Sequence, residues 1–94
     1  MQLRDALFYW LQMKVVWEAR PKDHSAKETA QFFAKILRED HHVSDMEVKL
    51  EENAYKVRFF VKGEPDELRF DRQQVEQLLQ AIESDPRYGQ LFDT

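Results

Sequence analysis

The feature that most constrains this chain is its first long segment, Leu3 to Ala19, which reads LRDALFYWLQMKVVWEA without a glycine or proline. At about 100° per residue, many of its apolar side chains gather on one helical face. That face comprises Leu3, Ala6, Leu7, Trp10, Leu11, Met13 and Trp17. Other apolar side chains remain on the flanks, and a helix that is apolar nearly all round is either fully buried or shared with a partner.

The flanks of this helix provide the candidate contact site. Phe8 and Val15 lie together on one flank, and Tyr9 and Val16 lie further round. The 94 residues fit a single domain, 1–94, and a domain of this size buries only about 60–65% of the surface of its unfolded chain. We therefore expect these four side chains to form an interface.

Two alternatives for covering the flank lie within the chain. The C-terminal tail contains Tyr88, Leu91 and Phe92, which we expect to dock on the domain. A second helix is predicted from a capping box at Ser25 to Glu28, beginning at Ala26 and ending near Asp40. Its apolar stripe is Ala26, Ala30, Phe33 and Leu37, widened by Phe32 and Ile36.

From Met46 the apolar period changes from about 3.6 to 2, which predicts strands. Alternation runs from Met46 to Leu50 and again from Tyr55 to Val61, and a short third strand is centred on Leu68 and Phe70. Asp71 can then cap a last helix. Its apolar stripe is Val75, Leu78, Leu79 and Ile82.

The expected fold is α+β, with the order α-α-β-β-β-α and a three-stranded antiparallel meander. We expect the helices to pack mainly on one face of the sheet, with the first helix at the edge. The outer face of the sheet should carry charged cross-strand pairs of both signs, with Phe60 as an exception.

The order from the second helix onward resembles that of double-stranded RNA-binding domains, which bind phosphates through a basic helix start and a contact loop. Here the corresponding loop is Glu51-Glu52-Asn53-Ala54, and the last helix begins Asp71-Arg72-Gln73-Gln74. Both positions carry acids where the family has basic residues. The resemblance is therefore one of element order, and nucleic-acid binding is the alternative and not the favoured role.

A nucleic-acid alternative would have to use the basic N-terminal half. Residues 1–38 hold seven Lys and Arg residues against four acids, whereas residues 39–94 hold seven against fourteen. The seven basic residues are Arg4, Lys14, Arg20, Lys22, Lys27, Lys35 and Arg38. A nucleic-acid-associated regulatory protein would bind its nucleic acid through these basic residues.

The sequence offers no recognisable catalytic, cofactor-binding or metal-binding signature, and we infer no small-molecule substrate. There is no cysteine, and the adjacent His41 and His42 diverge by about 100° on a helix. The two glycines, Gly63 and Gly89, do not form a phosphate-binding loop. We therefore expect a non-enzymatic protein without a cofactor.

The lack of cysteine fits a reducing compartment, and we expect a cytoplasmic protein. The longest apolar run, Ala6–Leu11, is too short for a membrane span. Trp10 and Trp17 allow a membrane-surface alternative, but the polar face is not distinctly cationic. The favoured hypothesis is protein–protein interaction, as a homodimer built around the first helix or with another protein partner.

Overall fold

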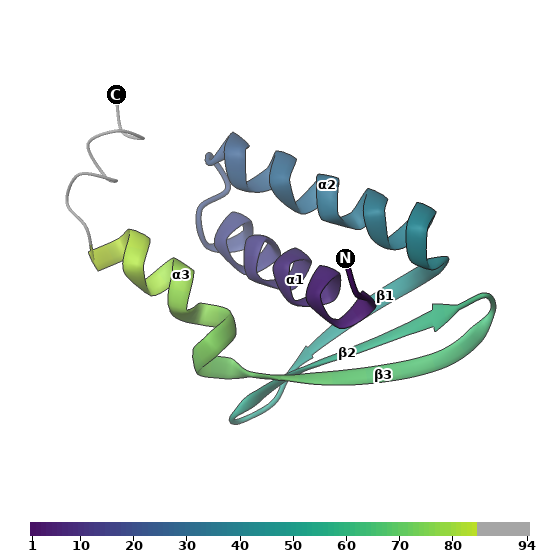
Figure 1. Ribbon diagram of the computed structural model, residues 1–94. Coiled ribbons are helices and arrows are strands. Elements are labelled where there is room, and N and C mark those ends of the chain that lie inside the picture. Colours follow the sequence, from purple (N-terminus) through teal and green to yellow (C-terminus); the bar gives the residue numbers. More distant parts are fainter. Residues whose placement is uncertain (85–94) are drawn as a thin grey trace.

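The computed structural model describes residues 1–84 of the 94-residue chain. Its elements are α1 (Leu3–Ala19), α2 (His24–His41), β1 (Val43–Leu50), β2 (Ala54–Val61), β3 (Glu64–Asp71) and α3 (Arg72–Ser84). The strands form an antiparallel sheet in the order β1-β2-β3, and the helices lie on one of its faces (Figure 1). The predicted α+β fold and its element order are confirmed. The expected docking of the C-terminal tail lies outside the described residues.

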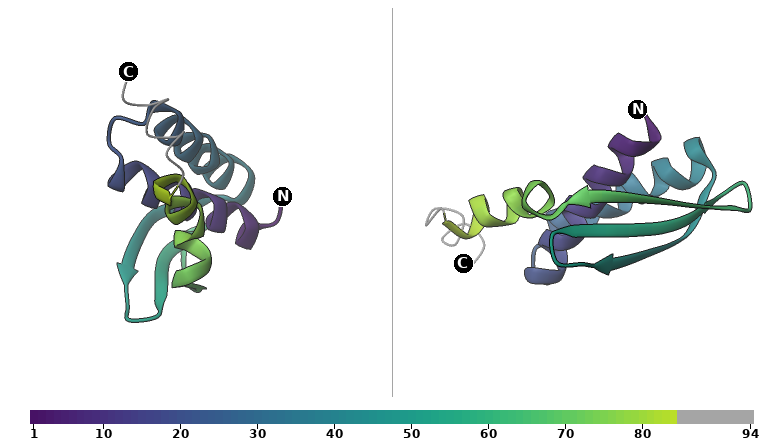
Figure 2. Two further views of the ribbon diagram at one scale, coloured as in Figure 1. Left: turned by 90° about the vertical axis from the view of Figure 1, so that its left-hand side faces the viewer. Right: turned by 90° about the horizontal axis from the view of Figure 1, so that it is seen from below.

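α1 lies at the centre of the fold, whereas the sequence analysis placed this helix at the edge. It packs between α2 and the sheet, and α3 runs alongside it (Figures 1 and 2). Leu7, Leu11 and Val16 of α1 have no exposed area. The edge position was wrong because a helix with apolar side chains nearly all round has to be covered on several sides.

The apolar side chains form two clusters, and α1 belongs to both. The larger cluster joins α1 to the inner face of the sheet, with Leu37 of α2 and Val75 of α3. In the smaller cluster, Val16 of α1 meets Ala26 of α2 and Ile82 of α3. α1 therefore connects the sheet core to a second core made by the three helices.

The central position of α1 can be tested with one pair of leucines. Leu11 has no exposed area, whereas Leu50 at the end of β1 is 49% exposed. Leu11→Ala should lower the free energy of unfolding by about 2–5 kcal/mol, because it leaves a cavity. Leu50→Ala is the matched control and should cost less than about 1 kcal/mol. Urea denaturation followed by tryptophan fluorescence measures both, and equal losses would contradict the central position.

α2 begins two residues before the predicted start. Its N-cap is Asp23, whose Oδ1 accepts a hydrogen bond of 3.0 Å from the main-chain N–H of Ala26. The carboxyl is buried in the loop after α1, at 7% exposure for the residue. Ser25 therefore lies inside the helix, and its predicted role as the cap is wrong.

The two candidate caps predict different losses of stability. Asp23→Ala should lower the free energy of unfolding by about 1 kcal/mol, because the N–H of Ala26 loses its acceptor. Ser25→Ala is the control and should change it by less than about 0.5 kcal/mol. Thermal unfolding followed by circular dichroism compares them. A larger loss of stability for Ser25→Ala would contradict the Asp23 cap and support the capping box predicted from the sequence.

β1 begins at Val43, three residues before the predicted start, because a bulge interrupts its alternation. The pairing register with β2 shifts between Ser44 and Glu47. Asp45, within this bulge, has a positive φ of 53°, a conformation that aspartate visits more readily than most residues. The extra residue hides the start of the strand from a period-2 pattern.

The outer face of the sheet carries charged pairs, as predicted. Lys56 Nζ lies 3.5 Å from Glu67 Oε1, and Arg69 Nε lies 3.4 Å from Glu51 Oε1. Phe60 is the expected exception and is 38% exposed. Exposed pairs of this kind contribute little to stability, so the inner face and the helices hold the fold together.

Candidate functional site

The four predicted interface residues separate into three environments. Tyr9 is 42% exposed, and Phe8 beside it is half-buried. Val15 is also half-buried and lines a groove beside β1. Val16 has no exposed area, because α2 and α3 close over it. Val16 is thus core in the folded chain and cannot belong to a surface site.

Phe8 and Tyr9 belong to a row of aromatic rings that crosses three elements. Tyr9 stacks on Phe33 of α2 with 5.5 Å between ring centroids, and Phe33 meets Phe32 edge-on at 5.5 Å. In the other direction, Phe8 lies 5.7 Å from Tyr9 and 5.9 Å from the Phe70 ring of β3. We call Phe8, Tyr9, Phe32 and Phe33 the aromatic surface.

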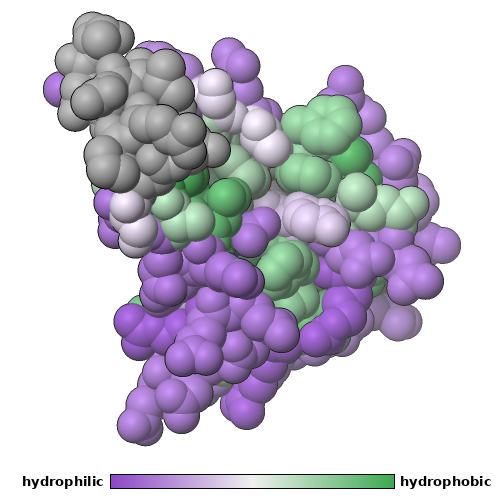
Figure 3. All heavy atoms as spheres, turned by 60° about the vertical axis from the view of Figure 1, so that its left-hand side comes forward, coloured by the Kyte–Doolittle hydropathy of each residue, from purple (hydrophilic) through white to green (hydrophobic). Residues whose placement is uncertain are grey.

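The outer end of this row is its most exposed part. Phe32 is 59% exposed, although the helical pattern placed it near the buried stripe of α2. At the inner end Phe70 is only 3% exposed and belongs to the larger core cluster. In the view of Figure 3, hydrophobic side chains gather over the upper part of the molecule and hydrophilic ones cover the lower end.

Contacts between rings make this surface ordered before any partner binds. Aromatic pairs at centroid separations of 4.5–7 Å contribute about 0.5–1.5 kcal/mol beyond their buried area. Each ring of the aromatic surface makes such a contact, and Phe70 anchors the row in the core. A surface held in this way loses little side-chain entropy on binding.

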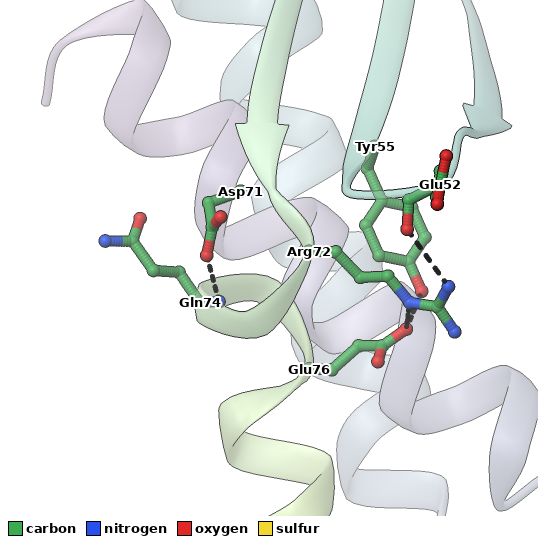
Figure 4. Close-up of polar contacts among 6 residues, drawn as sticks. All are labelled: Glu52, Tyr55, Asp71, Arg72, Gln74 and Glu76. Carbon is green, nitrogen blue, oxygen red and sulfur yellow. Dashed lines mark hydrogen bonds and ion pairs between the residues drawn. The ribbon is translucent and has the colours of Figure 1, made fainter.

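A separate polar cluster joins the start of α3 to the β1–β2 turn (Figure 4). The Tyr55 hydroxyl donates a 2.6 Å hydrogen bond to Glu76 Oε2, which also accepts from Arg72 Nε at 3.1 Å. The main-chain N–H of Arg72 donates to the carbonyl of Asn53 at 3.0 Å. The predicted cap is also present, since Asp71 Oδ2 accepts from the N–H of Gln74 at 3.1 Å (Figure 4).

The state of Tyr55 argues for a structural role of this cluster. Burial, and then the hydrogen bond to Glu76, raise the pKa of Tyr55 from 10.0 to about 12. The hydroxyl therefore stays protonated at neutral pH, where it acts as a donor. A general base or a phenolate nucleophile would need a pKa shifted in the opposite direction.

This pKa shift predicts a pH dependence of stability. Because the pKa of Tyr55 is higher in the folded chain than in the unfolded one, the stabilisation is complete below pH 10 and is lost as the pH rises towards 12. Subtracting the ultraviolet phenolate titration of Tyr55→Phe from that of the wild type should give one step near pH 12. A step near pH 10 would contradict the buried hydrogen bond.

The nucleic-acid alternative gains no specific support from the positions of its cations. Arg4 lies over the Phe70 ring at 5.0 Å from its centroid, and Lys14 forms an ion pair with Glu18 one turn later. Both cations thus interact with their own chain. The β1–β2 turn, which would be the contact loop of the RNA-binding arrangement, carries Glu51 and Glu52.

Residues 1–84 contain neither a cluster of metal-binding side chains nor a membrane-spanning helix. No three or more histidine, aspartate and glutamate side chains lie close enough together to hold a metal ion. No helix among these residues is long and apolar enough to span a membrane. Trp10, a candidate for contact with a membrane surface, is only 8% exposed and lies in the core.

With this geometry in view, the chain was compared with known proteins. No family model, curated protein or solved structure matches it.

Proposed function

We propose that this chain acts by protein–protein contact, without catalysis, and that it forms a homodimer through the aromatic surface. The observation that carries this proposal is the ordered row of rings on α1 and α2, with Phe32 59% exposed at its outer end. Aromatic residues are enriched in protein interfaces, and a few anchored rings often contribute most of the binding energy.

The charges around the aromatic surface are of both signs, which suits a protein partner better than a polyanion. Glu28 and Lys35 are exposed on α2 at positions four before and three after Phe32, so they lie on the same side of the helix. Arg4 and Asp5, one turn before Tyr9, are also exposed. A protein partner that carries both acidic and basic side chains can therefore form ion pairs with these residues.

This distribution of charge favours a second copy as the partner. When α2 packs antiparallel to α2 of the second copy with a two-fold axis at Phe32, Glu28 lies near Lys35 of that copy. The same pairing recurs on the other side of the axis, as it must in a two-fold contact. The apolar centre and both flanking pairs are then self-complementary.

Replacement of the exposed ring tests the proposal. Phe32→Glu should raise the dissociation constant of this contact at least about 30-fold, as expected for loss of a central interface residue. Light scattering after size exclusion, over a wide dilution range, should show half the wild-type mass.

Phe60→Glu is the matched control, because Phe60 is 38% exposed on the outer face of the sheet, away from the aromatic surface. It should leave the mass unchanged, and circular dichroism should show that both variants are folded. A wild-type mass of 11.4 kDa at all concentrations, or no effect of Phe32→Glu, would reject the homodimer.

A further inference from the structure

The two edge strands of the sheet, β1 and β3, differ in how readily a further strand could pair with them. β3 is protected: Pro65 has no N–H, and the N–H of Glu67 is occupied by a 2.7 Å hydrogen bond to Asp66 Oδ1. Such features block the addition of a further strand. β1 has a bulge at Asp45, which protects its first half, but it has no proline and keeps a regular register with β2 from Glu47 to Leu50.

The direction of the main-chain groups of β1 follows from its hairpin with β2. The N–H of Glu51 donates to the carbonyl of Ala54 at 2.8 Å, so Glu51 faces β2. In an antiparallel pair this direction alternates. Lys49 and Glu47 therefore also face β2, whereas Val48 and Leu50 direct their N–H and C=O groups to the free edge.

The side chains beside this edge are incompletely covered. Leu50 is 49% exposed and Val48 is half-buried, both on the inner face of the sheet. They line an open groove of about 480 Å³ together with Val15 of α1 and Leu79 of α3, and the charged side chains of Lys14, Glu18 and Glu76 also line it. On the outer face, Glu47 and Lys49 are exposed. Among residues 1–84, no strand pairs with the outward main-chain groups of Val48 and Leu50. This edge also has a partly apolar inner side and a charged outer side.

We infer that β1 pairs antiparallel with β1 of a second copy, about a two-fold axis at Val48. In this register the outward-facing groups of Val48 meet those of Val48 of the second copy. Glu47 then lies opposite Lys49 of that copy on the outer face, twice. Met46 lies opposite Leu50 of that copy, so that two apolar side chains meet beside the groove.

Within the segment that keeps a regular register, from Glu47 to Leu50, the charges favour this pairing over its neighbours; Asp45 lies in the bulge and outside that segment. Because only alternate residues face the edge, the pairing can shift only in steps of two residues. A shift in one direction places Lys49 opposite Lys49 of the second copy, and a shift in the other places Glu47 opposite Glu47. Like charges directly opposite are destabilising, and opposite charges are stabilising. The sequence from Met46 to Leu50 is therefore self-complementary in one central register.

This contact goes beyond the proposed function, because it uses the sheet edge and not the aromatic surface on the helices. It also accounts for the partial exposure of Val15, which lines the groove that the second copy would help to close. A chain with two different two-fold contacts can assemble beyond the dimer, and we expect a closed set of four, from which loss of either contact leaves a dimer.

Charge reversal tests the register without touching the core. Lys49→Glu puts two carboxylates into each of the two cross-strand pairs, and light scattering after size exclusion should show half the wild-type mass. Glu47→Lys together with Lys49→Glu restores opposite charges and should restore the wild-type mass. Both side chains are exposed, so circular dichroism should show folded protein in each case. An unchanged mass for Lys49→Glu, or no recovery in the double variant, would overturn the inference.

Hydrogen exchange supplies a second measurement. The amides of Val48 and Leu50 should be protected in the wild type and should exchange faster in Lys49→Glu. Protection that persists in a Lys49→Glu variant of reduced mass would mean that a segment of the same chain covers the edge, and would also overturn the inference.

The aromatic contact and the β1–β1 contact can be tested independently of each other. Loss of mass with Phe32→Glu but not with Lys49→Glu would leave the proposed function standing and reject strand pairing. The reverse result would reject the aromatic contact and support strand pairing. Combining Phe32→Glu with Lys49→Glu should give a monomer of 11.4 kDa.

Discussion

The burial of α1 is the constraint on which the rest of this structure depends. The helix has apolar side chains nearly all round, and one neighbouring element can cover only part of such a surface. α2, the sheet and α3 each cover one side of it, which places α1 in both core clusters. The other two helices consequently lie where α1 needs cover, and α2 has little contact with the sheet beyond β1. Its outward side carries the exposed Phe32.

The elements of this fold could be predicted from sequence because each has a clear apolar period. The position of α1 could not, since a helical wheel gives the direction of each side chain but not what lies opposite. Tyr9 and Val16 are seven residues apart on the same flank, yet one is 42% exposed and the other has no exposed area. The difference arises because α3 reaches the C-terminal half of α1, where Ile82 closes over Val16.

Local features were missed when they depended on main-chain geometry. Asp23 and Ser25 are both good capping residues, and the loop conformation after α1 decides that Asp23 accepts the hydrogen bond. The bulge at Asp45 similarly could not be predicted, because in the sequence it only interrupts the alternation and so makes the strand look shorter. The aromatic surface was found only in part, because Phe8 and Tyr9 were visible on α1, whereas Phe32 looked like a wide edge of a buried stripe. Only the packing of α2 on α1 brings these rings together.

The contrast between the two sheet edges has a consequence for how large an assembly can become. Sheets with two open edges can add strands without end, and this is how fibres grow. In this chain Pro65 and the Asp66–Glu67 contact close β3. Once β1 has a neighbour, both outer edges of the enlarged sheet are therefore closed strands. In the proposed pairing, the sheet therefore accepts one neighbour at β1, and the two β3 edges then oppose further growth.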